Sequence, residues 1–269
     1  MKVEFTKELT GDAFIDIRLA VNERADNLLL ENLSDEKKRL LEKIQTRPEH
    51  IFRFEEFQPL LEMAAQTKKL WKSNRTLQVY FFDGQDARKR RVLEYASIWS
   101  QYCGITFQET ARIADAKIRV AFQAPSSWSY IGTDALGVPR HEPTINFGWL
   151  DNNLPERDYK QVVLHEFGHA LGLIHEHQSP AVRVRWNKPI VYWYFNVHHN
   201  WSQADVDRNL FQEFEKTSTQ YSGLDRLSIM GYYIPPEFTV DGLEFPLNYD
   251  LSDMDKHYIG QLYPRMILS

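Results

Sequence analysis

The sequence has almost no cysteine, no long apolar run and no excess of basic residues. Cys103 is the only cysteine among 269 residues, so no disulfide can form within the chain and its stability must come from a hydrophobic core. No stretch reaches the length of a transmembrane helix, which predicts no membrane span. The formal net charge of −5 offers no footprint for nucleic acid. The composition therefore argues against disulfide scaffolds, integral membrane proteins and nucleic-acid binders.

The most informative segment runs from His165 to His175 and reads HEFGHALGLIH. His165 and His169 stand four residues apart, so on a helix they project from one face a single turn apart. Two neutral imidazoles placed in this way can hold one Zn²⁺. Gly172 allows the chain to leave the helix and to bring His175 back as a third ligand. Three protein ligands leave a fourth position open, which is the arrangement of a catalytic zinc site.

Glu166 directly follows the first histidine of this segment. It cannot share the ligand face of the helix, but its carboxylate can act as a general base on an attacking water. The alternative interpretation is a helix whose histidines are ordinary core or surface groups. A short HExxH match alone does not exclude that alternative. The longer spacing through His175, together with a second motif, makes it improbable.

The second motif is SIMGY, which spans residues 228–232. HExxHxxGxxH followed by SxMxY resembles the metzincin zinc endopeptidases, in which the methionine lies in a tight turn beneath the metal. Within that clan, three further segments resemble the astacin-like peptidases of bacteria and fungi. They are HEHQSP from His175, RWNK from Arg185 and LSDMD from Leu251. The resemblance covers roughly residues 71–264.

The resemblance implies that His165, His169 and His175 bind one catalytic Zn²⁺ and that Glu166 is the general base. It implies a zinc-dependent endopeptidase that acts on protein or peptide substrates. One alternative is a zinc-binding pseudoenzyme or interaction module that keeps the fold without turnover. Another is a delivered toxin protease with one specific host target. The sequence leaves the physiological substrate and the oligomeric state open.

Two residues of the second motif also receive roles from the resemblance. Met230 is the methionine of the Met-turn, a packing residue beneath the site, and a polarizable gap-filler suits that place. Tyr232 is expected near the metal, where its hydroxyl can donate to the developing oxyanion. The neighbouring Tyr233 is the alternative for this role, although the spacing favours Tyr232.

The pattern along the chain divides it into two parts. Residues 1–70 are charged and carry apolar residues at helical spacing, which predicts a helical N-terminal region, prodomain-like or partner-binding. Residues 71–269 form the predicted catalytic domain. Gly11 and Asp12 match half of the FxGD motif whose aspartate binds zinc in astacin propeptides, and an ordinary turn is the alternative interpretation.

The second part alternates strands with helices. We expect strands at residues 77–82, 105–108, 118–122, 127–132 and 144–147. Helices are expected at residues 87–102, from Asp158 onward, and at residues 251–263 with Ser252 as N-cap. This order predicts an α+β fold of the metzincin type. It has a mixed five-stranded sheet, two long helices above the cleft and a loop-rich C-terminal subdomain, whose aromatic residues 186–195 belong to its core.

The first residues of the chain give no targeting signal. Residues 1–8 lack the apolar core of a signal peptide. We nevertheless expect a secreted or exported protein.

Overall fold

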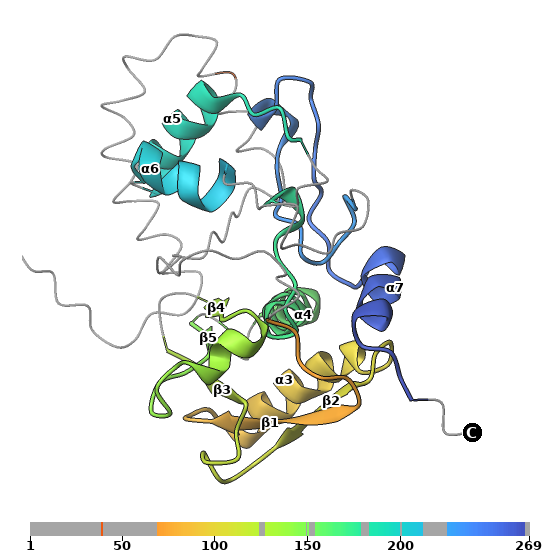
Figure 1. Cartoon of the computed structure of the whole chain (residues 1–269). Helices are drawn as coiled ribbons and strands as arrows, with labels where there is room; N and C mark the ends of the chain where they lie inside the picture. Colours follow the sequence, from red (N-terminus) through yellow and green to blue (C-terminus); the bar gives the residue numbers. More distant parts are fainter. Residues whose placement is uncertain are drawn as a thin grey trace, which may run out of the picture.

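A computed structural model describes Arg39 and residues 69–123, 127–148, 150, 154–178, 183–199, 201–211 and 225–266. Apart from Arg39 and residues 69 and 70, the predicted helical N-terminal region, including Asp12, lies outside the described residues. Figure 1 shows the sheet and helix α3 at one end of the molecule, helices α5 and α6 at the other, and α4 between them. This arrangement places the motif helix between two subdomains.

A mixed five-stranded sheet forms the first subdomain, as predicted. Its order is β2-β1-β3-β5-β4. The neighbours β2, β1, β3 and β5 run parallel, whereas β4 runs antiparallel to β5 and pairs Ser127 with Phe147. The strand bounds are β1 Arg75–Phe81, β2 Ile105–Glu109, β3 Ile118–Ala121, β4 Ser127–Ser129 and β5 Ile145–Phe147.

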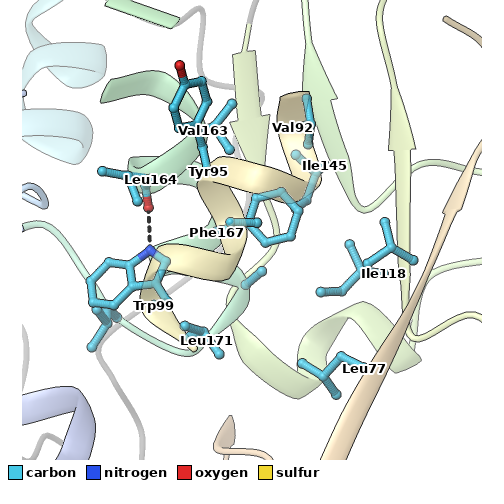
Figure 2. Packing of buried hydrophobic residues seen from close by; sticks show 14 of the residues in the cluster. Leu77, Val92, Tyr95, Trp99, Ile118, Ile145, Val163, Leu164, Phe167 and Leu171 are labelled. Carbon is cyan, nitrogen blue, oxygen red and sulfur yellow. Dashed lines mark hydrogen bonds between the residues drawn. The ribbon is translucent and has the colours of Figure 1, made fainter. Parts of the chain in front are cut away.

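The core lies between this sheet and two long helices, α3 (Asp86–Trp99) and α4 (Glu156–Ala170). Alternate residues of β1 are buried, because successive side chains of a strand point to opposite faces. One face of β1 therefore packs with both helices in a single apolar cluster, which Figure 2 shows around Trp99 and Phe167. The Trp99 indole N–H donates to the Leu164 carbonyl over 2.9 Å, so a buried hydrogen bond also joins α3 to α4.

The predicted edge strand at residues 127–132 is shorter than expected. It ends at Ser129, and Gly132 begins a 3₁₀ helix, η3 (Gly132–Leu136), with a positive φ of 52°. A Cβ at this position would overlap the backbone carbonyl of Lys69, and the Lys69 ammonium pairs with Asp134 over 2.7 Å. The close approach of residue 69 and the positive φ therefore both require glycine at the start of η3.

Residues 69–71 attach the start of the described region to the end of α4. The Trp71 indole N–H donates to the Ala170 carbonyl over 2.8 Å, and its backbone N–H donates to the Tyr263 hydroxyl over 3.2 Å. The same hydroxyl donates to the Leu171 carbonyl over 2.6 Å. These bonds satisfy carbonyls that the end of a helix leaves without partners within the helix.

The second subdomain contains one longer helix and several short elements joined by loops. Its aromatic run lies on a helix, α5 (Lys188–His199), because Val191, Tyr194 and Phe195 follow helical spacing and are buried together. They form a second apolar cluster with residues of three short elements, so the prediction that they belong to a core is confirmed. These elements are α6 Gln203–Val206, the π-helical turn η5 Asp207–Phe211 and the 3₁₀ helix η6 Pro236–Phe238.

The last helix, α7 (Asp253–Leu262), is capped by Ser252 as predicted. It packs on the first apolar cluster through Ile259, and Figure 1 shows it beside α4. Cys103 is buried in the same cluster, as expected for a small apolar side chain. In the described ranges, no helix has the length and apolar character needed to cross a membrane.

Candidate metal centre

Three histidines meet at the end of α4 that faces the second subdomain. His165 and His169 lie one turn apart on this helix, as their spacing predicts. After the helix ends, Gly172 adopts a φ of 96°, and the chain turns back to present His175 just before the short helix η4 (Glu176–Gln178). All three imidazoles are buried.

The three Nε2 atoms converge on one point. The distances from His165 to His169 and from His165 to His175 are both 3.2 Å, and His169 lies 3.1 Å from His175. A tetrahedral zinc ion with bonds of about 2.0–2.1 Å holds its nitrogen ligands roughly 3.3–3.4 Å apart. The triangle of nitrogens therefore has the size that such an ion requires.

The other ring nitrogen of each histidine faces an oxygen that can only accept a hydrogen bond. His165 Nδ1 lies 2.8 Å from the Ile229 carbonyl, and His169 Nδ1 lies 2.8 Å from the Leu173 carbonyl. His175 Nδ1 lies 3.2 Å from Gln178 Oε1. Each Nδ1 must therefore carry the proton, which leaves a lone pair on each Nε2. Three lone pairs at this separation repel one another unless a cation lies among them, so the donor set fits zinc.

Burial also keeps the ligands in the form that binds metal. Burial, with a smaller contribution from the adjacent His165, lowers the pKa of His169 to about 3. Burial likewise holds the pKa of His175 well below its usual range, with a further contribution from the neighbouring imidazoles. Both rings are therefore neutral at neutral pH, as metal coordination requires.

Glu166 lies on α4 next to the first histidine and is 0% exposed. The cluster of groups able to hold a metal comprises His165, His169 and His175, and Glu166 is not a member of it. This placement agrees with a residue that acts beside the metal and does not bind it.

Met230 lies beneath the histidines, against α4. A Cβ on Gly168 would overlap the Met230 sulfur, so glycine in the motif lets the methionine side chain approach the helix backbone. The Met230 carbonyl accepts a hydrogen bond from the Glu176 N–H over 3.1 Å. The turn therefore contacts the chain on both sides of the third histidine.

Tyr232 places its ring against the histidines. Its centroid lies 4.1 Å from that of His175 and 5.1 Å from that of His177. The neighbouring Tyr233 is buried and lies near Tyr194, whose pKa is raised mainly by burial and further by Tyr233. Of the two tyrosines considered from the sequence, Tyr232 has its ring against His165 and His175.

Three residues at this site were not identified from the sequence. Gln178 holds His175, His177 stacks on Tyr232, and Asp255 bonds to the turn that contains Met230. All three lie in the HEHQSP and LSDMD segments that carried the family resemblance. The segments signalled their importance, but only the fold shows what each side chain contacts.

Comparisons with known proteins agree with this geometry. The family model described as Astacin, a family of peptidases, matches residues 63–242. A structure of myroilysin is 41% identical over 74% of this chain and 98% of its own, with a TM-score of 0.72. A second myroilysin crystal structure is 40% identical over 73% of this chain and 86% of its own, with a TM-score of 0.56.

A more distant match extends the fold comparison. High choriolytic enzyme 1, a hatching enzyme zinc-protease from the medaka fish Oryzias latipes, is 17% identical over 74% of this chain and 96% of its own, with a TM-score of 0.50. At that identity the likeness concerns the fold alone. No curated protein matches the chain.

Replacing His169 by alanine is expected to abolish zinc binding, because two imidazoles cannot complete the site. Zinc content per purified protein, measured by elemental analysis, checks this. The control is His141→Ala, which removes an exposed histidine and should leave zinc content unchanged. Full zinc occupancy in His169→Ala would disprove the ligand assignment.

Proposed function

We propose that this chain, which belongs to the astacin family of zinc metalloendopeptidases, cleaves peptide bonds at a single zinc ion held by His165, His169 and His175. The observation that carries the proposal is the convergence of three Nε2 lone pairs, each fixed by an acceptor at Nδ1. When bound, zinc supplies a Lewis acid that polarises the scissile carbonyl and lowers the pKa of a coordinated water by several units.

Glu166 is the proposed general base. It takes a proton from the attacking water and later delivers that proton to the leaving amine. Its complete burial strengthens electrostatic interactions with the reacting groups, because the surrounding dielectric is low. Its position one residue after His165 keeps it close to the metal without making it a ligand.

Tyr232 is the proposed oxyanion donor. Its ring rests on His175 and is only partly buried, so its hydroxyl can face a substrate carbonyl while the ring stays anchored. A preorganised donor at this place stabilises the negative charge that develops in the transition state.

Protein and peptide substrates follow from the peptidase family. We propose that the substrate backbone lies extended along β4, the last strand of the described sheet, which contacts α4. Addition of a strand to a sheet edge holds a peptide by its backbone and leaves specificity to side-chain pockets. Export from the cell stays a prediction.

We keep the division into residues 1–70 and 71–269 as a proposal, with one refinement. Lys69 pairs with Asp134, and Leu70 lies where a Cβ on Gly172 would touch it. These two residues therefore already contact the catalytic domain, and a separable covering segment ends at residue 68.

Glu166→Ala should retain its zinc and its fold but lose about 10²–10⁴-fold in kcat, because only the proton carrier is removed. Peptide cleavage and elemental analysis on the same preparation measure both properties. A kcat within about tenfold of wild type would rule out Glu166 as the main base. A wild-type protein that binds zinc and cleaves no peptide of a diverse library would favour the pseudoenzyme alternative.

Tyr232→Phe should lower kcat by about 10–10³-fold with zinc content unchanged, because one of two stabilisers of the oxyanion is lost. Tyr233→Phe is the matched control, since it removes the same hydroxyl from the adjacent residue, and it should change kcat little. If the two variants behave in the opposite way, the oxyanion role belongs to Tyr233.

Removing residues 1–68 should preserve or raise peptidase activity, as expected if this segment covers the cleft. A longer truncation that also removes residues 69–71 should lower the melting temperature, because it breaks the bonds from Trp71 to Ala170 and Tyr263. Thermal unfolding and peptide cleavage compare the two proteins. Loss of activity in the shorter truncation, with zinc and fold intact, would make the N-terminal region part of the working enzyme.

A further inference from the structure

Asp255 stands at the third position of α7 and takes part in the cap of that helix. Its backbone N–H donates to Ser252 Oγ over 2.8 Å, and its own Oδ2 accepts the Ser252 N–H over 3.0 Å. This reciprocal pair is a capping box. Capping alone needs no burial, because the box lies at the surface of most helices. Asp255, however, is only 7% exposed.

The same carboxylate also holds the Met-turn, residues 228–230. Oδ1 accepts the Ser228 hydroxyl over 2.7 Å, and Oδ2 accepts the Ile229 N–H over 2.8 Å. Ser228 Oγ in turn accepts the Met230 N–H over 3.0 Å. One buried side chain therefore fixes the backbone of the whole turn from outside it.

Ile229 connects this carboxylate to the metal centre. Its N–H donates to Asp255, and its carbonyl accepts the Nδ1 proton of His165 over 2.8 Å. Ile229 alone therefore links Asp255 to His165. The bond from its carbonyl to His165 sets the ring orientation and the tautomer of that histidine. Groups that bond to the second nitrogen of a ligand histidine raise its basicity and orient it.

A second capping box in the chain shows what capping requires by itself. Ser202 and Asp205 form the same reciprocal pair at the start of α6. Asp205 is partly exposed, and it also forms an ion pair with Arg208 in the adjoining turn η5. Asp255 instead is buried. Burial raises the pKa of its carboxyl, and the nearby Asp225 carboxylate raises that pKa further. A carboxylate in so costly a place does more than cap a helix.

We propose that Asp255 is a positioning residue of the metal centre. By fixing the Met-turn, it holds the Ile229 carbonyl against His165 and so increases the affinity of the three histidines for zinc. The inference rests on the proposed zinc site, and it adds a residue from the C-terminal helix that contacts neither metal nor substrate.

The test is the zinc dissociation constant of the full chain, measured by competition with a chromophoric chelator after metal removal. Asp255→Ala should raise this constant by about 10–100-fold, the usual effect of losing a group that supports a metal ligand. Ser228→Ala removes the bond to Oδ1 and the bond from the Met230 N–H to Ser228 Oγ, but it keeps the bond from the Ile229 N–H to Oδ2. It should therefore give a smaller increase in the same direction. Cobalt-substituted protein should show altered visible absorption in Asp255→Ala, because the ligand geometry changes.

Two controls separate this effect from loss of a helix cap. Ser252→Ala removes the cap of α7 but leaves the bonds from Asp255 to Ser228 and Ile229, and Asp205→Ala removes the equivalent box at α6. Both should lower the melting temperature of the metal-free protein while leaving the zinc constant within about threefold of wild type. Equal zinc constants in Asp255→Ala and Ser252→Ala would overturn the proposal.

The remaining outcomes are also decisive. If Asp255→Ala does not fold, Asp255→Asn replaces it, since an amide keeps an acceptor for the turn but lacks the full charge, and it should still weaken zinc binding. An unchanged zinc constant in a folded Asp255→Asn and Ser228→Ala would then refute the inference. Wild-type protein whose zinc binding does not depend on His169 would refute the proposed metal site itself, which is a separate failure.

Discussion

Three unprotonated imidazole nitrogens within 3.2 Å of one another are the constraint on which this structure depends. Each nitrogen can offer a lone pair only if the other nitrogen of its ring keeps the proton, and this requires an acceptor in a fixed place. The chain supplies the acceptors from three different segments. They are the Leu173 carbonyl after the helix, the Gln178 side chain in η4 and the Ile229 carbonyl in the Met-turn.

The Met-turn is therefore more than a floor beneath the metal. The Met230 side chain packs on Gly168 of α4, and the Met230 carbonyl accepts the Glu176 N–H. Asp255 of α7 accepts the Ile229 N–H and so holds the backbone of the turn. Ile229 and Met230 belong to the apolar cluster of the first subdomain, whereas Tyr232 packs against that of the second. The four residues 229–232 thus join the two apolar clusters at the edge of the site.

The sequence predicted the parts of this arrangement that depend on local spacing. The helical offset of His165 and His169, the turn at Gly172 and the cap at Ser252 each follow from residues within one turn of one another, and the structure contains all three. The aromatic run was predicted as core but not as a helix, because aromatic residues on several sides of α5 conceal the helical spacing. The edge strand was predicted to reach Gly132, but Gly132 begins η3 and lies against the Lys69 carbonyl, a contact distant in sequence that the local pattern does not show.

The backbone carbonyls that accept from the histidines could not be predicted from the sequence, for a different reason. Any residue can present a carbonyl, so Ile229 and Leu173 carry no signature of their function. Asp255 reads as the N3 residue of a capping box, and this local explanation conceals a contact with residues 26 and 27 positions earlier in the chain. The resemblance to a family marked the LSDMD segment as important without giving a physical reason.

Because the chain cannot form an internal disulfide, buried hydrogen bonds must connect segments that lie far apart in the sequence. With Cys103 as its only cysteine, the chain joins distant segments by hydrogen bonds inside its apolar core: Trp71 to Ala170, Trp99 to Leu164 and Tyr263 to Leu171. Each contributes only about 0.5–1.5 kcal/mol when formed, but breaking one leaves a buried group without its partner at a cost of about 1–3 kcal/mol. In all three bonds the acceptor is a backbone carbonyl of α4 or of the residue that follows it. The helix that carries two of the proposed metal ligands, His165 and His169, therefore also accepts these three long-range bonds, so the demands of stability and of the proposed site fall on the same backbone.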